Sequence, residues 1–91
     1  MPMIARFYGI VIRMYVNDHL PPHFHAVYGD FEARFQIGSG ERMDSPFPRH
    51  ASRLVEDWAE LHRAELTRNW QLIESGELPL EMEGLDAGQG H

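Results

Sequence analysis

The 91-residue sequence contains no cysteine and no lysine, and each absence excludes a class of site. Without cysteine, the chain can form neither a disulfide nor a thiolate metal site, and it has no cysteine nucleophile. Without lysine, all eight basic residues are arginines, whose forked guanidinium groups suit carboxylate and phosphate partners. The lack of cysteine fits a reducing compartment, so we expect a cytoplasmic protein.

Long hydrophobic runs are also missing, since no stretch approaches the roughly 20 apolar residues that span a bilayer. The apolar N-terminal stretch is interrupted by Arg6 and Arg13 and lacks a small-residue cleavage site. It therefore predicts a strand and not a signal peptide. The chain length predicts a single domain over residues 1–85, followed by a disordered tail over residues 86–91.

The formal net charge of −6 is unevenly distributed along the chain. Residues 1–53 hold six arginines against five acidic residues, whereas residues 54–91 hold two arginines against nine acidic residues. The acidic second part disfavours a bulk attraction to nucleic acid. We therefore expect any anion to be held by a local cluster in the first part.

Hydrophobic alternation predicts a three-stranded antiparallel sheet. Residues 4–16 are rich in β-branched and aromatic side chains and form the first expected strand, with a bulge or a close backbone approach at Gly9. The pair Gly29-Asp30 then separates two alternating segments, which is typical of a two-residue hairpin turn. The first strand and this hairpin together make the expected β-β-β sheet.

The expected hairpin sorts its side chains between the two faces of the sheet, because successive residues of a strand point to opposite sides. With the turn at Gly29-Asp30, one face carries His23, His25 and Arg34, and His25 lies opposite Arg34. The other face is aromatic or apolar and is the expected core face. Its residues are Phe24, Ala26, Tyr28, Phe31, Ala33, Phe35 and Ile37.

After a loop rich in glycine, serine and proline, the apolar residues have the spacing of a helix. Apolar residues recur at helical intervals from Ala51 to Leu61, and the next interval lengthens to five residues at Leu66. This break predicts a second helix beginning near Arg63 and ending before Gly76. The predicted fold class is α+β: a three-stranded antiparallel sheet followed by two helices packed on one face. The buried stripes of the two helices also include Leu54, Val55, Trp58, Trp70 and Ile73.

The uncovered face of the expected sheet carries the candidate functional residues. His23 and His25 point the same way, about 6–7 Å apart according to the strand rise, and can serve as a catalytic acid–base pair. Arg13 and Arg34 are the expected anion clamp. This set resembles a small phosphodiester-cleaving site that needs no cofactor and no metal. The supporting residues are Tyr15 and His19.

Other uses of the same face stay open. The two histidines can hold a divalent metal ion, with Asp18, His19 or Glu32 as the third ligand. The face can also bind an anion such as RNA, a protein partner or a second copy of this chain, without turnover. The acidic helices offer a further docking surface for a basic partner.

Several segments resemble one bacterial family, the one catalogued as domain of unknown function 4160. The resemblance is carried by MPMIARFYGIVIRMY, DHLPPHFHAVYGDFEA, WAELHRAELTRNW and GELPLEMEGL. It extends from Pro2 to about Leu85 and departs mainly at IGSGERMDSPFP. The resemblance implies a small protein encoded beside a partner gene and assigned on that basis as the toxin component of a toxin–antitoxin pair. Because such toxins are often ribonucleases, it also favours RNA as a substrate.

Overall fold

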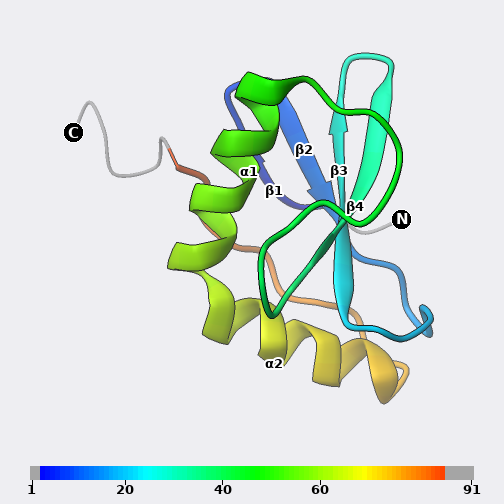
Figure 1. Ribbon diagram of the computed structural model, residues 1–91. Helices are drawn as coiled ribbons and strands as arrows, with labels where there is room; N and C mark the ends of the chain where they lie inside the picture. The colour runs from blue at the N-terminus through cyan, green and yellow to red at the C-terminus, as the bar shows by residue number, and fades with distance from the viewer. Residues whose placement is uncertain (1–2, 86–91) are drawn as a thin grey trace.

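The computed structural model describes residues 3–85 and contains four strands followed by two helices (Figure 1). The strands form one antiparallel sheet in the order β1-β2-β3-β4, so neighbours in the chain are neighbours in the sheet. The α+β class predicted from the sequence is confirmed. The elements are β1 Met3–Phe7, β2 Ile10–Arg13, β3 His23–Tyr28, β4 Phe31–Gln36, α1 Arg49–Leu61 and α2 Arg63–Glu74.

The sheet has four strands and not the expected three, because the segment expected as the first strand reverses direction at Tyr8-Gly9. Tyr8 has a φ of 49° and Gly9 a φ of 79°, both in the left-handed region. A two-residue turn with this conformation matches the twist of antiparallel strands. Phe7 pairs with Ile10 across it. Gly9 therefore belongs to a hairpin turn and not to a bulge.

The second hairpin has the register that the alternation predicted. His25 pairs with Arg34 across β3 and β4, and Gly29 has the φ of 59° that suits the first position of the turn. The turn end of the expected core face is less covered than predicted: Tyr28 is only partly buried, and Phe31 is 44% exposed. Both residues adjoin the turn, where the hairpin ends.

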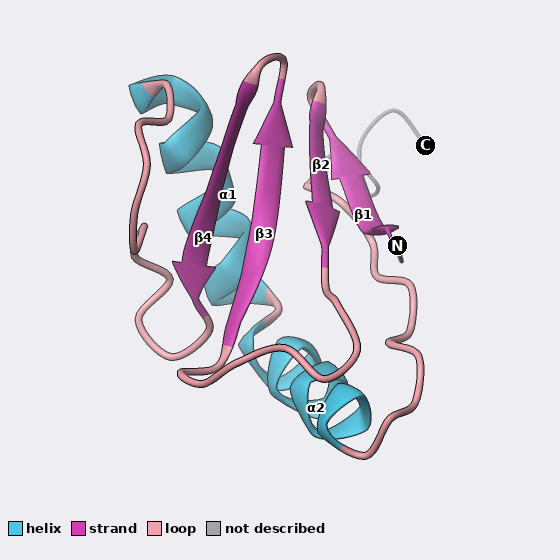
Figure 2. Ribbon diagram, turned by 90° about the vertical axis from the view of Figure 1, so that its right-hand side faces the viewer, coloured by secondary structure: helices cyan, strands magenta, loops and turns pink. Residues whose placement is uncertain are grey.

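One face of the sheet is covered by α1, whereas α2 crosses the end of the sheet where β3 begins (Figure 2). The expectation that both helices pack on one face is therefore correct only for α1. Trp58 of α1 is fully buried, stacks on Phe7 with ring centroids 5.4 Å apart and meets Phe24 edge-on. Leu61, expected in the core, is 72% exposed because it lies at the end of α1. The residues that α2 adds to the core are Leu66, Trp70 and Ile73.

The two helices are separated at His62, as the lengthened apolar spacing predicted. The φ of −112° and ψ of 24° at His62 end α1, and α2 begins at Arg63. Gly76 follows α2 with a φ of 82°, a conformation that glycine commonly adopts after a helix. Within residues 3–85, neither helix is long and apolar enough to cross a membrane.

The segment after α2 packs against the core without regular secondary structure. The buried Asn69 side chain donates a hydrogen bond to the Leu80 carbonyl and accepts one from the Leu80 N–H, each 2.9 Å long. The Trp58 indole N–H donates to the Glu83 carbonyl at 2.7 Å. These contacts attach the segment to both helices. The tail predicted to be disordered, residues 86–91, lies outside the described residues.

Candidate functional site

The loop between β2 and β3 runs along the end of the sheet, next to α2 (Figure 2). Met14 is buried, and Val16 packs against the core. The Asn17 N–H donates to the Ile73 carbonyl of α2 at 3.2 Å. Asn17 has a φ of 64°, which asparagine tolerates better than most residues. These anchors hold Asp18 beside the start of β3.

Asp18 meets both histidines of β3. Its Oδ2 atom lies 3.0 Å from Nε2 of His23 and 2.9 Å from Nε2 of His25. One potential ligand atom from each of the three residues lies within 4.8 Å of the other two. The structure thus joins the two histidines to a carboxylate from the preceding loop. We call these three residues the Asp18 cluster.

His23 is buried, which corrects the expectation that both histidines lie on an uncovered face. His23 is 1% exposed, and its ring lies 5.5 Å from the Trp70 ring of α2. The alternation placed His23 on the polar face correctly. The alternation does not indicate that α2 and the loop before β3 cover this end of the sheet. The side chain of His25, two residues further along β3, is 15% exposed.

The two ring nitrogens of His23 have different surroundings. Nδ1 lies 2.7 Å from the Pro21 carbonyl oxygen, and because a carbonyl only accepts, Nδ1 carries the proton. Nε2 is buried and lies close to Asp18 Oδ2 but is not aligned with it, so Nε2 has no hydrogen-bond partner within residues 3–85. A neutral His23 therefore has a buried lone pair on Nε2, without a hydrogen-bond donor and 3.0 Å from a carboxylate oxygen. This contact is unfavourable until a proton or a cation lies between the two atoms.

His25 also has an oxygen near each ring nitrogen, but its Nε2 has a hydrogen-bond partner. Because an ionised carboxylate only accepts, Nε2 of His25 donates the 2.9 Å hydrogen bond to Asp18 Oδ2, and Nδ1 lies 3.5 Å from Glu32 Oε2. The Tyr15 ring meets the imidazole edge-on, with centroids 4.4 Å apart. Both histidines thus have an oxygen beside Nδ1 and direct Nε2 toward Asp18. Proteins orient metal-ligating histidines in this way.

The surroundings of Asp18 favour its ionised form. Burial raises the pKa of Asp18, but hydrogen bonds from His25 and from the His19 backbone N–H, together with the charges of both clustered histidines, outweigh burial. The net result is a pKa below the ordinary value of 3.8. The His19 side chain itself is exposed and lies outside the Asp18 cluster, so His19 supports the site through its backbone.

The two arginines of the expected anion clamp differ in their partners. Arg34 is paired with Asp44, whose Oδ2 accepts from Nε at 2.9 Å and lies 2.8 Å from Nη2. Arg13 lies directly across from His25 in the register of β2 and β3. Its Nε is buried without a hydrogen-bond partner, and its side chain forms no ion pair within the described part of the chain. Within residues 3–85, Arg13 is therefore a cation beside the cluster without an ion-pair partner.

Sequence reasoning left Asp18 as one of three alternatives for a third ligand, beside His19 and Glu32. The structure brings the Asp18 carboxylate to the two histidines and places Glu32 behind His25. The Pro21 carbonyl, which orients His23, was not foreseen. The available signal was an aspartate five residues before His23, in a loop restricted by two prolines.

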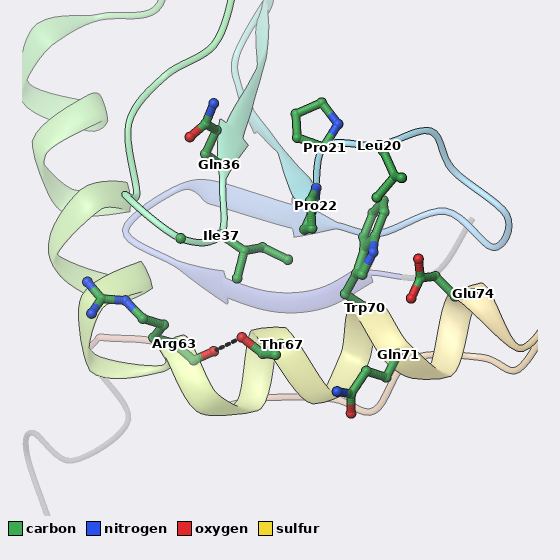
Figure 3. A pocket seen from close by; sticks show the side chains of 11 residues that line it. Leu20, Pro21, Pro22, Gln36, Ile37, Arg63, Thr67, Trp70, Gln71 and Glu74 are labelled. Carbon is green, nitrogen blue, oxygen red and sulfur yellow. Dashed lines mark hydrogen bonds between the residues drawn. The ribbon is translucent and has the colours of Figure 1, made fainter.

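A cavity of about 470 Å³ lies beside the Asp18 cluster, between α2, residues 20–22 and the end of β4 (Figure 3). Trp70 extends from α2 toward Leu20 and lines this cavity (Figure 3). The same indole contacts the ring of His23. Asp18, His23 and His25 do not line the cavity, so it is separate from the potential ligand atoms.

Comparisons with known proteins give one match. The model of the family described as Domain of unknown function (DUF4160) matches residues 9–71, which is more than half of the chain. The resemblance seen in the sequence is therefore confirmed. The searches of curated proteins and of solved structures found no match.

Proposed function

The chain belongs to the DUF4160 family, and we propose that it binds one divalent transition-metal ion through Asp18, His23 and His25. The family description carries no activity, so the proposal rests on the site. The observation that supports it is the buried Nε2 of His23, which faces a carboxylate oxygen without a hydrogen bond. A cation between these atoms would be attracted to both lone pairs.

The spacing of the donor atoms suits octahedral coordination. For metal–ligand bonds of about 2.1 Å, adjacent donors lie about 3.0 Å apart around an octahedral ion and about 3.4 Å apart around a tetrahedral one. The two distances between Asp18 Oδ2 and the histidine Nε2 atoms are 2.9 and 3.0 Å. Two histidines and a carboxylate would leave the remaining positions to water or substrate. An ion held by these three residues would supply Lewis-acid chemistry, polarising a bound oxygen or activating a bound water.

A protonated His23 paired with Asp18 is the alternative to a bound ion. Two features favour the ion. His25 directs its own Nε2 at the same oxygen, and the Nδ1 atoms of both histidines have oxygen neighbours that can accept a hydrogen bond when Nδ1 carries the ring proton. The burial of His23 also favours a ligand role over the metal-free acid–base role, because a buried imidazole cannot exchange a proton directly with a substrate.

Isothermal titration of the tag-free protein with Zn²⁺ and Co²⁺, in excess Mg²⁺ to occupy weak acidic sites, tests the proposal. We expect one ion per chain. Asp18→Asn and His25→Ala should weaken binding by more than about 100-fold, since changes to residues that only orient a ligand already cost about 10- to 100-fold. Glu32→Gln, which alters the neighbour of His25 Nδ1, should weaken binding by about 10- to 100-fold.

The matched control is His62→Ala, which removes a histidine that also pairs with a carboxylate, Glu65, but lies between α1 and α2, outside the Asp18 cluster. It should bind the ions as the parent does. Circular dichroism establishes that each variant is folded. Parent-like affinity in folded Asp18→Asn, or binding lost equally in His62→Ala, would overturn the proposal.

A second candidate function is a toxin-type component that acts on RNA and is neutralised by a protein partner. The free guanidinium of Arg13 beside the Asp18 cluster favours it, because arginine binds phosphate groups. In this candidate function, an ion bound by the Asp18 cluster would take the catalytic role predicted from the sequence for His23 and His25 as an acid–base pair.

A third candidate is a non-catalytic interaction module. Val11 and Val27 pair on the face of the sheet that α1 leaves uncovered, and both are only partly buried. This apolar centre favours a protein partner or a second copy of the chain.

A further inference from the structure

We infer that Arg13 and the metal ion of the Asp18 cluster together bind one phosphate group, so that the substrate class is a phosphate ester. The inference rests on the proposed metal site and names the ligand that would fill the remaining coordination positions of the ion. It differs from the clamp predicted from the sequence, because Arg34 takes no part.

The strand register places Arg13 next to the cluster. Arg13 and His25 are direct partners in the antiparallel pair β2–β3, and such partners have Cβ atoms about 4.5–5.5 Å apart on the same face. The neighbours of Arg13 in the chain, Ile12 and Met14, are fully buried on the core side. Arg13 therefore projects from the face that α1 leaves uncovered, beside the more accessible of the two histidines.

The bonding of Arg13 leaves its terminal nitrogens for an external anion. Nε is buried, so packing restrains the stem of the side chain. Within residues 3–85 the guanidinium has no carboxylate partner, whereas Arg34, one strand further along the same row, is neutralised by Asp44. A guanidinium presents two parallel N–H groups that match two oxygens of a phosphate.

The charges around the loaded site sum to a positive value. A divalent ion adds two positive charges, and the carboxylates of Asp18 and Glu32 supply two negative ones. Arg34 and Asp44 cancel, which leaves the charge of Arg13. The site thus attracts an anion locally, although the whole chain has a net charge of −6. This contrast favours contact with a single phosphate group over contact along an extended polyanion.

Titration of the Co²⁺-loaded protein with methylphosphonate, a non-hydrolysable analogue of a phosphate ester, tests the inference. An oxygen that enters the coordination shell changes the visible absorption bands of Co²⁺, which gives a dissociation constant for the phosphonate. Arg13→Gln should raise this constant by about 10- to 100-fold, the size expected for lost hydrogen bonds to a charged group. Arg13→Lys should fall between Arg13→Gln and the parent, because it keeps the charge without the fork.

Arg6→Gln is the matched control, since it removes a positive charge from the exposed Arg6 of the neighbouring strand β1. It should bind methylphosphonate as the parent does. The affinity for Co²⁺ is measured separately for every variant. If Co²⁺ does not bind the parent, the metal site itself fails. If Co²⁺ binds but the phosphonate leaves the bands unchanged, or binds Arg13→Gln as tightly as the parent, only the phosphate inference fails.

Discussion

A single carboxylate oxygen, Oδ2 of Asp18, faces the Nε2 atoms of two imidazoles. This convergence makes Asp18→Asn an informative substitution. An asparagine amide has nearly the same shape and can donate a hydrogen bond to the lone pair on His23 Nε2. The variant should keep the packing of the loop while replacing a cation site with a neutral hydrogen bond. Alanine at the buried His23 would instead leave a cavity and an unpaired Pro21 carbonyl.

Asp44 provides a test of pH dependence at the residue scale. The hydrogen bond from the Arg34 side chain lowers the pKa of Asp44; burial partly opposes it, and the Arg34 backbone N–H lowers the pKa further. Because the folded pKa lies below 3.8, the pair stabilises fully above that pH, and this contribution is lost as pH falls through the folded value. Both side chains are 39% exposed, so we expect less than about 1 kcal/mol.

Urea unfolding of the parent and Asp44→Asn, from neutral to acid pH, measures this contribution. The variant should be slightly less stable at neutral pH, and the difference should disappear at the acid end. Asp57→Asn, at an exposed position of α1 without an ion pair in the described part of the chain, is the control and should follow the parent. A difference that grows as the pH falls would contradict the assignment.

At the scale of elements, the hairpin β3–β4 depends on the conformation of its turn. Gly29 has a φ of 59°, and a Cβ added there would meet no heavy atom within 4 Å. Gly38, just after β4, is equally open but is outside the left-handed region. Alanine at these two positions therefore separates backbone strain from steric contact.

We expect Gly29→Ala to lower the free energy of unfolding by about 1–2 kcal/mol, because an L-residue is strained at positive φ. Gly38→Ala should leave it unchanged or raise it by up to about 1 kcal/mol through the unfolded state. Urea unfolding of both variants makes the comparison. Equal effects of the two substitutions would show that the turn conformation does not limit stability.

The position of α2 is the feature of the elements that most affects the site. The helix crosses the end of the sheet (Figure 2). Its Trp70 contacts the ring of His23, and its Ile73 carbonyl accepts a hydrogen bond from the Asn17 N–H. One helix thus covers one residue of the Asp18 cluster and anchors the loop that carries Asp18.

At the scale of the whole molecule, two charge distributions have opposite effects on RNA binding. The acidic second part of the chain repels RNA, whereas the local positive charge of the metal-loaded site would attract a phosphate group. If the protein cleaves RNA, we expect cleavage to depend on the ion. A chelator should abolish cleavage, added Co²⁺ or Mn²⁺ should restore it, and Asp18→Asn should be inactive.

Incubation of the purified protein with labelled RNA, with and without chelator, measures this dependence, and His62→Ala is the control that should remain active. Cleavage that persists in the chelator would contradict the metal-dependent version of this function. It would favour the acid–base pair of His23 and His25 predicted from the sequence.

The sequence by itself determined the α+β class, the register of the β3–β4 hairpin and the break between the helices. Each of these depends on a local period. Alternation sorts the side chains of a strand, and the lengthened interval before Leu66 interrupts a helical stripe. The same local reasoning predicted a bulge or a close backbone approach at Gly9 within one strand and missed the turn, because a tyrosine at positive φ is uncommon and Tyr8-Gly9 lacks the usual turn residues.

Only the tertiary structure decided which atoms meet at the site. It brought the carboxylate of Asp18 to the Nε2 atoms of both histidines and buried His23 beneath α2; within residues 3–85 it gave Arg34 an ion-pair partner in Asp44 and gave Arg13 none. The physical reason is that strand periodicity assigns a side chain to a face, whereas its neighbours on that face come from elements and loops distant in the chain. Their positions follow from how the whole core packs.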